Sequence, residues 1–203
     1  MTELERRLAR GADASLDRER LGSDLAKRAQ RAGLLDVAYA PMDSPLGQLL
    51  VAVTPRGLVR VAYEGEPADE VLAELAERVS PRVLRAPRRT DAVRRELEAY
   101  FAHRRRRFET AVDWSLVRGF ARGVLNATAR VPYGEVSTYS AMAAAAGSPR
   151  AYRAAGNALG SNPIPIVVPC HRVLHADGGL GGYAGGLDRK RFLLELEGTL
   201  PVR

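Results

Sequence analysis

Residues 137–160, STYSAMAAAAGSPRAYRAAGNALG, decide the second half of the fold. The opening serine, Ser137, is a helix-capping type, and we expect a helix from it to Ala146 that Gly147 ends. The Ser-Pro pair that follows marks a new start and predicts a second helix over residues 150–159, closed by a glycine. Two short helices joined by a glycine-containing turn outline a helix-turn-helix, although an ordinary helical hairpin has the same outline and is commoner.

Upstream of this stretch the pattern changes from helices to a mixture of strands and helices. Residues 48–53 and 58–63 are β-prone runs, and Thr54-Pro55-Arg56-Gly57 between them signals a hairpin. Apolar residues at helical spacing predict helices over residues 68–79 and 91–102. These elements form a small α/β unit. A further helix over residues 115–129 leads into the helical part.

Length and composition limit the class of protein. The chain has 203 residues, of which 46% are hydrophobic and 27% charged, so we expect one large or two small globular domains. No apolar stretch is long enough to cross a membrane, and the first residues lack the apolar segment of a signal peptide. We therefore expect a cytoplasmic protein with no membrane contact. One cysteine excludes an internal disulfide and, with three histidines, makes a metal site improbable; no cofactor is expected.

Basic side chains are concentrated in the middle of the chain. The net charge is +7, and residues 82–107 carry ten basic against three acidic residues, which suggests an anionic partner. The densest part, Arg104–Arg107, we interpret as a solvated loop or a helix end in preference to a phosphate contact. Residues 1–36 carry 15 charges and leucines that hint at short amphipathic helices, and their purpose is open.

The single cysteine lies in the most informative sequence, IPIVVPCHRV, residues 164–173. Cys170 follows an apolar run and lies between a proline and His171. We therefore expect the thiol at the end of a buried segment, in a backbone that the proline makes rigid. A free thiol is mostly protonated at neutral pH, and an adjacent histidine is the obvious base to activate it. A lone cysteine is more often a small buried hydrophobe, but this context favours a nucleophile.

The segment Pro169-Cys170-His171-Arg172-Val173 closely resembles the active-site motif of the O6-alkylguanine-DNA alkyltransferases, also called methylated-DNA–protein-cysteine methyltransferases. The order and spacing of other segments also agree with that family, namely residues 132–136, 154–158, 161–163 and 182–187 through 196–198. The resemblance covers residues 37–200. The resemblance implies an α+β fold with a charged extension, a small ribonuclease-H-like α/β domain, and a winged helix-turn-helix alkyltransferase domain. The expected domains are residues 1–36, 37–112 and 113–203.

The resemblance also implies a reaction. The alkyl group of O6-alkylguanine, and of O4-alkylthymine, would pass irreversibly and stoichiometrically to Cys170 after the base flips out of the duplex. His171 would take the thiol proton, through a bridging water, and Glu197 would orient the imidazole. Tyr139 would donate to the ring nitrogen of the departing base, and Asn162 would hold the turn beside the active site.

Further residues receive binding roles from the same resemblance. The lesion pocket would include the Ala184 amide and the Val173 carbonyl, with Gly185 and Gly186 letting the loop approach the base; its residues are Tyr139, Val173, Tyr183, Ala184, Gly185 and Gly186. Arg153 would fill the space that the flipped base leaves, in the minor groove of double-stranded DNA. The DNA contacts would come from Arg153, Ala151, Ala154, Gly156, Tyr152 and Arg172, with Ala155 as a further small neighbour. We expect a monomer, with cooperative binding on DNA left open.

Other interpretations of the same residues stay open from sequence. Val173 and Tyr183 could simply be core, Tyr139 an amphipathic helix residue, and Glu197 the last-turn residue of a helix. Tyr152 is bulkier than the small residue expected there. Among functions, the rivals are a non-catalytic lesion-binding relative, which Cys170 argues against, a cysteine hydrolase using Cys170, His171 and Glu197, and a DNA-binding regulator. We rank the alkyltransferase first.

Overall fold

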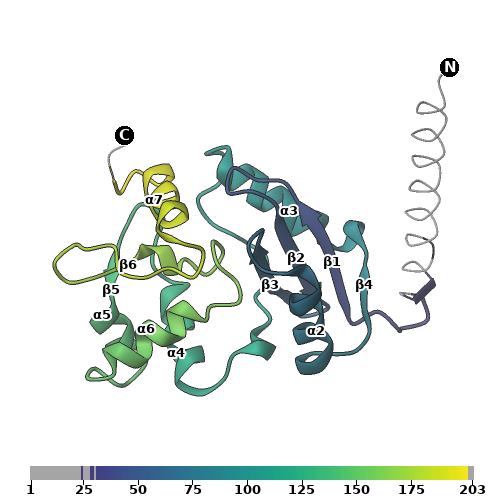
Figure 1. The fold of residues 1–203 in the computed structure, drawn as a ribbon, viewed down its shortest axis with the longest axis horizontal. Helices are drawn as coiled ribbons and strands as arrows, with labels where there is room; N and C mark the ends of the chain where they lie inside the picture. Colours follow the sequence, from purple (N-terminus) through teal and green to yellow (C-terminus); the bar gives the residue numbers. More distant parts are fainter. Residues whose placement is uncertain (1–23, 25–27, 30, 201–203) are drawn as a thin grey trace.

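The computed structural model describes residue 24, residues 28–29 and residues 31–200. The leucines of the N-terminal extension at positions 4, 8, 16, 21 and 25 lie outside the described residues. None of the helices within the described ranges has the length and apolar character needed to span a membrane. Figure 1 shows two bodies side by side, a sheet domain from the first half of the chain and a mainly helical domain from the second.

A four-stranded sheet organises the first domain. The predicted hairpin is confirmed, because β2 and β3 pair antiparallel around a two-residue turn, Pro55-Arg56. Two further strands, which the sequence analysis missed, complete the order β3-β2-β1-β4, with β1 antiparallel to β2 and parallel to β4. The strands are β1 (Val37–Met42), β2 (Leu49–Thr54), β3 (Gly57–Tyr63) and β4 (Val83–Arg85). The short β4 and the proline in β1 weaken the local strand signal.

Two amphipathic helices accompany this sheet, as predicted. The helix α2 (Ala68–Arg78) buries Val71 and Leu75, and α3 (Pro87–Phe101) packs against β1 and β2. The second helix begins four residues earlier than expected. Pro87 occupies its first turn, where the missing N–H costs nothing, and the polar residues after it leave no apolar periodicity to reveal that turn.

The second domain contains the predicted pair of short helices. It consists of η1 (Trp114–Leu116), α4 (Gly119–Thr128), β5 (Ser137–Thr138), α5 (Tyr139–Ala145), α6 (Tyr152–Gly160), η2 (Cys170–Arg172), β6 (Val173–Leu174) and α7 (Leu187–Leu196). Gly147 leaves α5 with a φ of +82°, which glycine adopts without strain. The helices α5 and α6 pack on each other and on α4, so the helix-turn-helix outline is confirmed.

In the second domain, three helix starts predicted from sequence are wrong by a few residues. The helix predicted from Ser115 begins at Gly119, because Val117 is extended between a 3₁₀ turn and α4. Ser137 belongs to β5, and the cap of α5 is Thr138, whose hydroxyl accepts from the Ala141 amide at 3.2 Å. The helix α6 starts at Tyr152 because the Ser-Pro pair first makes a separate turn.

The two domains share an interface of buried side chains and hydrogen bonds. One continuous hydrophobic cluster includes residues of both. The amide of Val61 in β3 donates to the Pro163 carbonyl at 2.9 Å, and Arg189 of α7 donates to the Leu46 carbonyl at 3.1 Å. Strand β3 therefore runs directly beside the loop that leads to Cys170.

Candidate active site

A cavity of about 720 Å³ opens between α5, α6 and the loop that follows β6. Cys170 lies on its wall. The cavity also brings together six residues that the sequence analysis had assigned to substrate or DNA binding, namely Tyr139, Tyr152, Arg153, Gly156, Tyr183 and Ala184. The residues that line the cavity are far apart in the sequence of the second domain, so they meet only when this domain folds.

Asn162 fixes the backbone that carries Cys170. Its side-chain amide donates to the Val168 carbonyl at 2.8 Å and lies 3.1 Å from the Cys170 sulfur, while its oxygen accepts from the Ile164 amide at 3.0 Å. Within this loop Ile166 has a φ of +73°, a strained conformation for a β-branched residue. The Asn162 side chain therefore holds this turn through hydrogen bonds to the backbone, and the same side chain contacts the sulfur.

The thiol of Cys170 is 5% exposed. Burial raises its pKa, and this effect outweighs the hydrogen bonds from Asn162 and Tyr183 and the charge of Lys190, which lower it. The resting sulfur is therefore a neutral thiol at physiological pH. A nucleophilic thiolate has to be produced by proton transfer to a nearby base.

His171 is the base that lies next to this cysteine in the chain, and it is completely buried. Its Nε2 is 3.0 Å from Glu197 Oε1, and its Nδ1 has no hydrogen-bond partner among the described residues. Burial lowers the pKa of His171 and outweighs the opposing effect of Glu197, so the ring is neutral at rest. An ionised Glu197 requires the proton on Nε2, which leaves the Nδ1 lone pair available to accept a proton.

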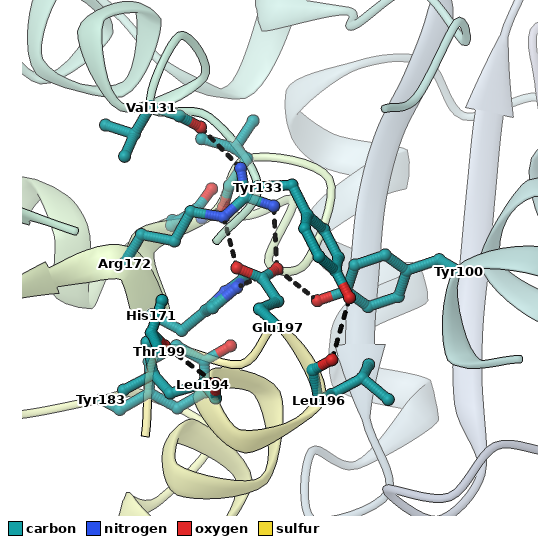
Figure 2. Close-up of polar contacts among 12 residues, drawn as sticks. Tyr100, Val131, Tyr133, His171, Arg172, Tyr183, Leu194, Leu196, Glu197 and Thr199 are labelled. Carbon is teal, nitrogen blue, oxygen red and sulfur yellow. Dashed lines mark hydrogen bonds and ion pairs between the residues drawn. The ribbon is translucent and has the colours of Figure 1, made fainter. Parts of the chain in front are cut away.

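Glu197 is the centre of a buried polar network (Figure 2). Arg172 donates to both carboxylate oxygens, each at 2.8 Å, and the hydroxyl of Tyr100 donates to Oε1 at 2.6 Å. Burial alone would raise the pKa of Glu197, yet the hydrogen bonds from His171 and Arg172 prevail and lower it to about 2. The carboxylate therefore stays ionised and orients His171.

The position of Arg172 corrects one sequence-based assignment. Arg172 was expected to contact DNA, but it is 6% exposed, and its guanidinium binds Glu197 and the Val131 carbonyl, the latter at 2.6 Å. It belongs to the Glu197 network and not to a surface that DNA could reach. The 3₁₀ turn η2 explains this, because it places two consecutive side chains, His171 and Arg172, on the same carboxylate.

Tyr100 and Lys190 are functional candidates that the sequence analysis missed. Tyr100 comes from α3 of the sheet domain, 97 residues away from Glu197, and no local pattern marks it (Figure 2). Lys190 is buried in α7, where its Nζ donates to the Val173 carbonyl at 2.7 Å and to that of Leu180. The available signal for it was its helical spacing from the leucines of α7, although its direct neighbours in the sequence are charged.

Of the residues predicted to bind the substrate, some line the cavity and others are buried within the protein. Tyr183 and Ala184 line the cavity, whereas Val173 is buried in β6 with its carbonyl already bonded to Lys190. Gly185 has a different neighbour from the one expected, because a Cβ there would lie 2.6 Å from the Tyr63 ring and 2.9 Å from that of Tyr183. Gly186 caps α7 with a φ of +87°. Both glycines thus have a structural reason within the protein itself.

The helix α6 presents the predicted DNA-facing residues with one exception. Arg153 and Tyr152 are exposed at the mouth of the cavity, where the guanidinium lies 5.8 Å from the tyrosine ring. Ala154 is exposed and Ala151 and Gly156 are half-buried, but Ala155 is fully buried and faces the core. Tyr152 does not pack inward, since its exposed fraction is 48%.

Within the described part of the chain, no group of three or more His, Cys, Asp or Glu side chains could hold a metal ion. Fold and site together define a class of two-domain proteins, in which a buried cysteine with a His-Glu partner faces a cavity built on a helix-turn-helix. The ribonuclease-like domain of 6-O-methylguanine DNA methyltransferases matches residues 37–114. The DNA binding domain of the same proteins matches residues 119–199.

Individual relatives agree with these matches. A methylated-DNA–protein-cysteine methyltransferase of Methanosarcina barkeri is 39% identical over 160 residues, which cover 78% of this chain and 96% of the relative. The crystal structure of Mycobacterium tuberculosis O6-methylguanine methyltransferase matches with a TM-score of 0.67 and 36% identity, covering 82% of this chain and 96% of that one. A structure of the same organism's OGT in complex with DNA has a TM-score of 0.67, 38% identity and coverage of 79% and 92%. The chain belongs to the methylated-DNA–protein-cysteine methyltransferase family.

Proposed function

We propose that this protein repairs DNA by transferring the alkyl group of O6-alkylguanine to Cys170, once per molecule. The observation that carries the proposal is the position of the single cysteine, on the wall of a helix-turn-helix cavity and beside a neutral, carboxylate-bound histidine. The relatives are named for the same methyl transfer, and one solved relative is bound to DNA. Attack on an alkyl carbon needs a strong nucleophile, and a thiolate is the best that side chains offer.

The residues suggest how the thiolate forms. The Cys170 proton passes to Nδ1 of His171 through a water molecule, and Glu197 stabilises the resulting imidazolium. Arg172 and Tyr100 keep the carboxylate ionised and fixed, so Glu197 does not itself take the proton. The positive charge of Lys190, close to the sulfur, favours the thiolate as well.

The transfer itself forms a bond from sulfur to carbon and breaks the bond from that carbon to O6. The electron pair of the broken bond goes to guanine, which would leave as an anion unless it is hydrogen-bonded. Tyr139 and Ala184 line the cavity, and we expect the Tyr139 hydroxyl and the Ala184 amide to donate to the base. The proton that His171 took from Cys170 then passes to the guanine, so the products are alkyl-cysteine and the neutral base. Because the thioether is stable, each molecule acts once.

Access to the base requires that the nucleotide leave the duplex. We propose that Arg153 takes its place in the stack from the minor groove, with Ala151, Ala154 and Gly156 allowing α6 to approach closely. Exposure of Arg153 and Tyr152 at the cavity mouth supports this. Transfer from O4-alkylthymine, a monomeric protein and a cytoplasmic location remain predictions from sequence.

An intact mass spectrum tests the reaction directly. The protein is mixed with an oligonucleotide containing O6-methylguanine, and the adduct is located by peptide mapping. We expect one methyl group per protein, on Cys170, and none in Cys170→Ser, which should still bind the DNA because α6 is untouched. An unmodified protein that still binds the lesion would indicate a recognition protein. An unmodified protein without binding, or methyl transfer by Cys170→Ser, would overturn the proposal.

A further inference from the structure

The sheet domain supplies a tyrosine that reaches the edge of the active site. Tyr63 is the last residue of β3, is 5% exposed, and its hydroxyl lies 2.6 Å from the hydroxyl of Tyr183. Tyr183 lines the same cavity as Cys170, and its hydroxyl acts to lower the pKa of the thiol. Two bonded hydroxyl groups therefore connect the first domain to the wall of the cavity that also holds the reactive sulfur.

The ring of Tyr63 is held firmly in this position. It meets the Tyr183 ring edge to face at 6.2 Å, and the guanidinium of Arg189 lies 4.9 Å from its centroid. Gly185 leaves room for it, since a side chain there would collide with both tyrosine rings. Arg189 is fixed in turn by the carbonyls of Gly185 and Leu46, at 2.9 and 3.1 Å. The contact between Tyr63 and Tyr183 is thus fixed by several neighbouring residues of the domain interface.

The number of hydroxyl protons limits the directions that hydrogen bonds of these two tyrosines can take. Each tyrosine has one hydroxyl proton, and burial raises the pKa of both Tyr63 and Tyr183, so both stay neutral. If Tyr63 donates to the Tyr183 oxygen, the Tyr183 proton is free to point at the sulfur. We propose that Tyr63 is a positioning residue that directs the Tyr183 hydroxyl toward Cys170 and so promotes formation of the thiolate. This role rests on Cys170 as the proposed nucleophile, yet it concerns the protein without DNA.

Other groups also face the sulfur and have to be held constant in a test. They are Asn162 from the loop before η2, Lys190 from α7 and Tyr139 from α5. None of them has a described hydrogen bond to Tyr63, so among the described hydrogen bonds Tyr63→Phe removes only the one to Tyr183. The Tyr63 amide keeps its bond to Glu66.

Alkylation of the free protein by iodoacetamide gives the measurement. Cys170 is the only cysteine, so the rate of carbamidomethylation, followed by intact mass, reports its thiolate alone. We expect Tyr63→Phe to move the midpoint of the pH–rate profile upward and to slow the reaction about 2- to 5-fold at pH 8, since loss of thiolate outweighs the gain in nucleophilicity. Tyr39→Phe, the same change in β1 of the same sheet, is the matched control and should leave the profile unchanged.

A double-mutant cycle separates positioning from packing. Tyr183→Phe should slow carbamidomethylation at least as much as Tyr63→Phe, and adding Tyr63→Phe to it should have no further effect. An unchanged profile in Tyr63→Phe, or an equal additional loss in the double variant, would overturn the proposed role. The mass assay with O6-methylguanine DNA is run in parallel. Normal methyl transfer with an unchanged iodoacetamide profile would contradict only the role of Tyr63, whereas no methyl transfer by the wild type would contradict the proposed function.

Discussion

At the scale of single residues, the carboxylate of Glu197 is a charge held entirely inside the protein. It accepts hydrogen bonds from an arginine, a tyrosine and a histidine, and none of its surface meets water. A buried carboxylate with this many donors is stable as an anion but costly if one partner is lost. The network therefore has two consequences, one for stability and one for its dependence on pH.

Replacing the charge should destabilise the protein. We expect Glu197→Gln to lower the free energy of unfolding by about 2–4 kcal/mol, because Arg172 would stay buried without a counter-charge. Urea denaturation measures this. Glu195→Gln, the same change on the same helix but half-buried and outside the network, should stay within about 0.5 kcal/mol of the wild type. Equal effects of the two changes would contradict the role of the network.

Acid should weaken the wild-type fold in two stages. The folded pKa of His171 is depressed below that of an unfolded histidine, so the unfolded chain binds the proton first and stability falls as pH drops below about 6.5. The folded pKa of Glu197 is about 2, so its contribution is complete above about pH 4.3 and is lost as pH falls toward 2. Urea midpoints between pH 8 and 3 check this, and constant stability between pH 7 and 5 would be inconsistent with a neutral buried His171.

At the scale of elements, α6 and the loop before α7 form two walls of one cavity. We expect substitutions in these two walls to have different effects. The helix carries an exposed arginine at the cavity mouth, whereas the loop is packed against a tyrosine from the other domain. Substitutions on the helix should alter the handling of DNA and leave stability unchanged. Substitutions in the loop should do the reverse.

The helix is tested with Arg153→Ala. We expect it to slow repair of O6-methylguanine in a duplex at least 10-fold more than reaction with the free O6-alkylated base, because only the duplex requires the flipped state to be held. Arg150→Ala, which removes the same charge from an exposed position just before α6, should weaken both DNA binding and duplex repair only modestly, because it lowers the general attraction for phosphates. Equal losses on duplex and free base for Arg153→Ala would argue against insertion.

The loop is tested with Gly185→Ala. The added methyl group would lie 2.6 Å from the Tyr63 ring, so we expect the free energy of unfolding to fall by about 1–3 kcal/mol as the two domains are pushed apart. In Gly182→Ala, on the same loop, the added methyl group would meet no atom within 4 Å, and this variant should unfold like the wild type. Thermal unfolding of the two variants compares them directly.

At the scale of the whole molecule, the domains share one hydrophobic cluster and several hydrogen bonds across their interface. We therefore expect one cooperative unfolding transition in urea. The unfolding curve from the fluorescence of the single tryptophan, Trp114 in η1, should coincide with that from far-UV circular dichroism, which averages over both domains. Two separate transitions would show that the interface contributes little.

The sequence by itself determined what depends on neighbours along the chain. The hairpin follows from two β-prone runs around a Pro-Arg turn, the amphipathic helices from apolar spacing, and the pairing of Cys170 with His171 from adjacency. Helix starts were less well predicted, because the neighbouring residue can offer nearly the same capping chemistry, as Thr138 does for Ser137. Resemblance to the family supplied Glu197 and Arg153, which no local pattern distinguishes.

Only the tertiary structure decided which side chains share an environment. Tyr100 reaches Glu197 across 97 residues, and Tyr63 reaches Tyr183 across 120 residues. The burial of Arg172, which the sequence analysis placed on DNA, depends on the same long-range packing. Backbone preferences act over a few residues, whereas burial and hydrogen bonding of polar side chains depend on what the folded chain places against them. The reactive motif was therefore predictable from local sequence, but the network that holds it was not.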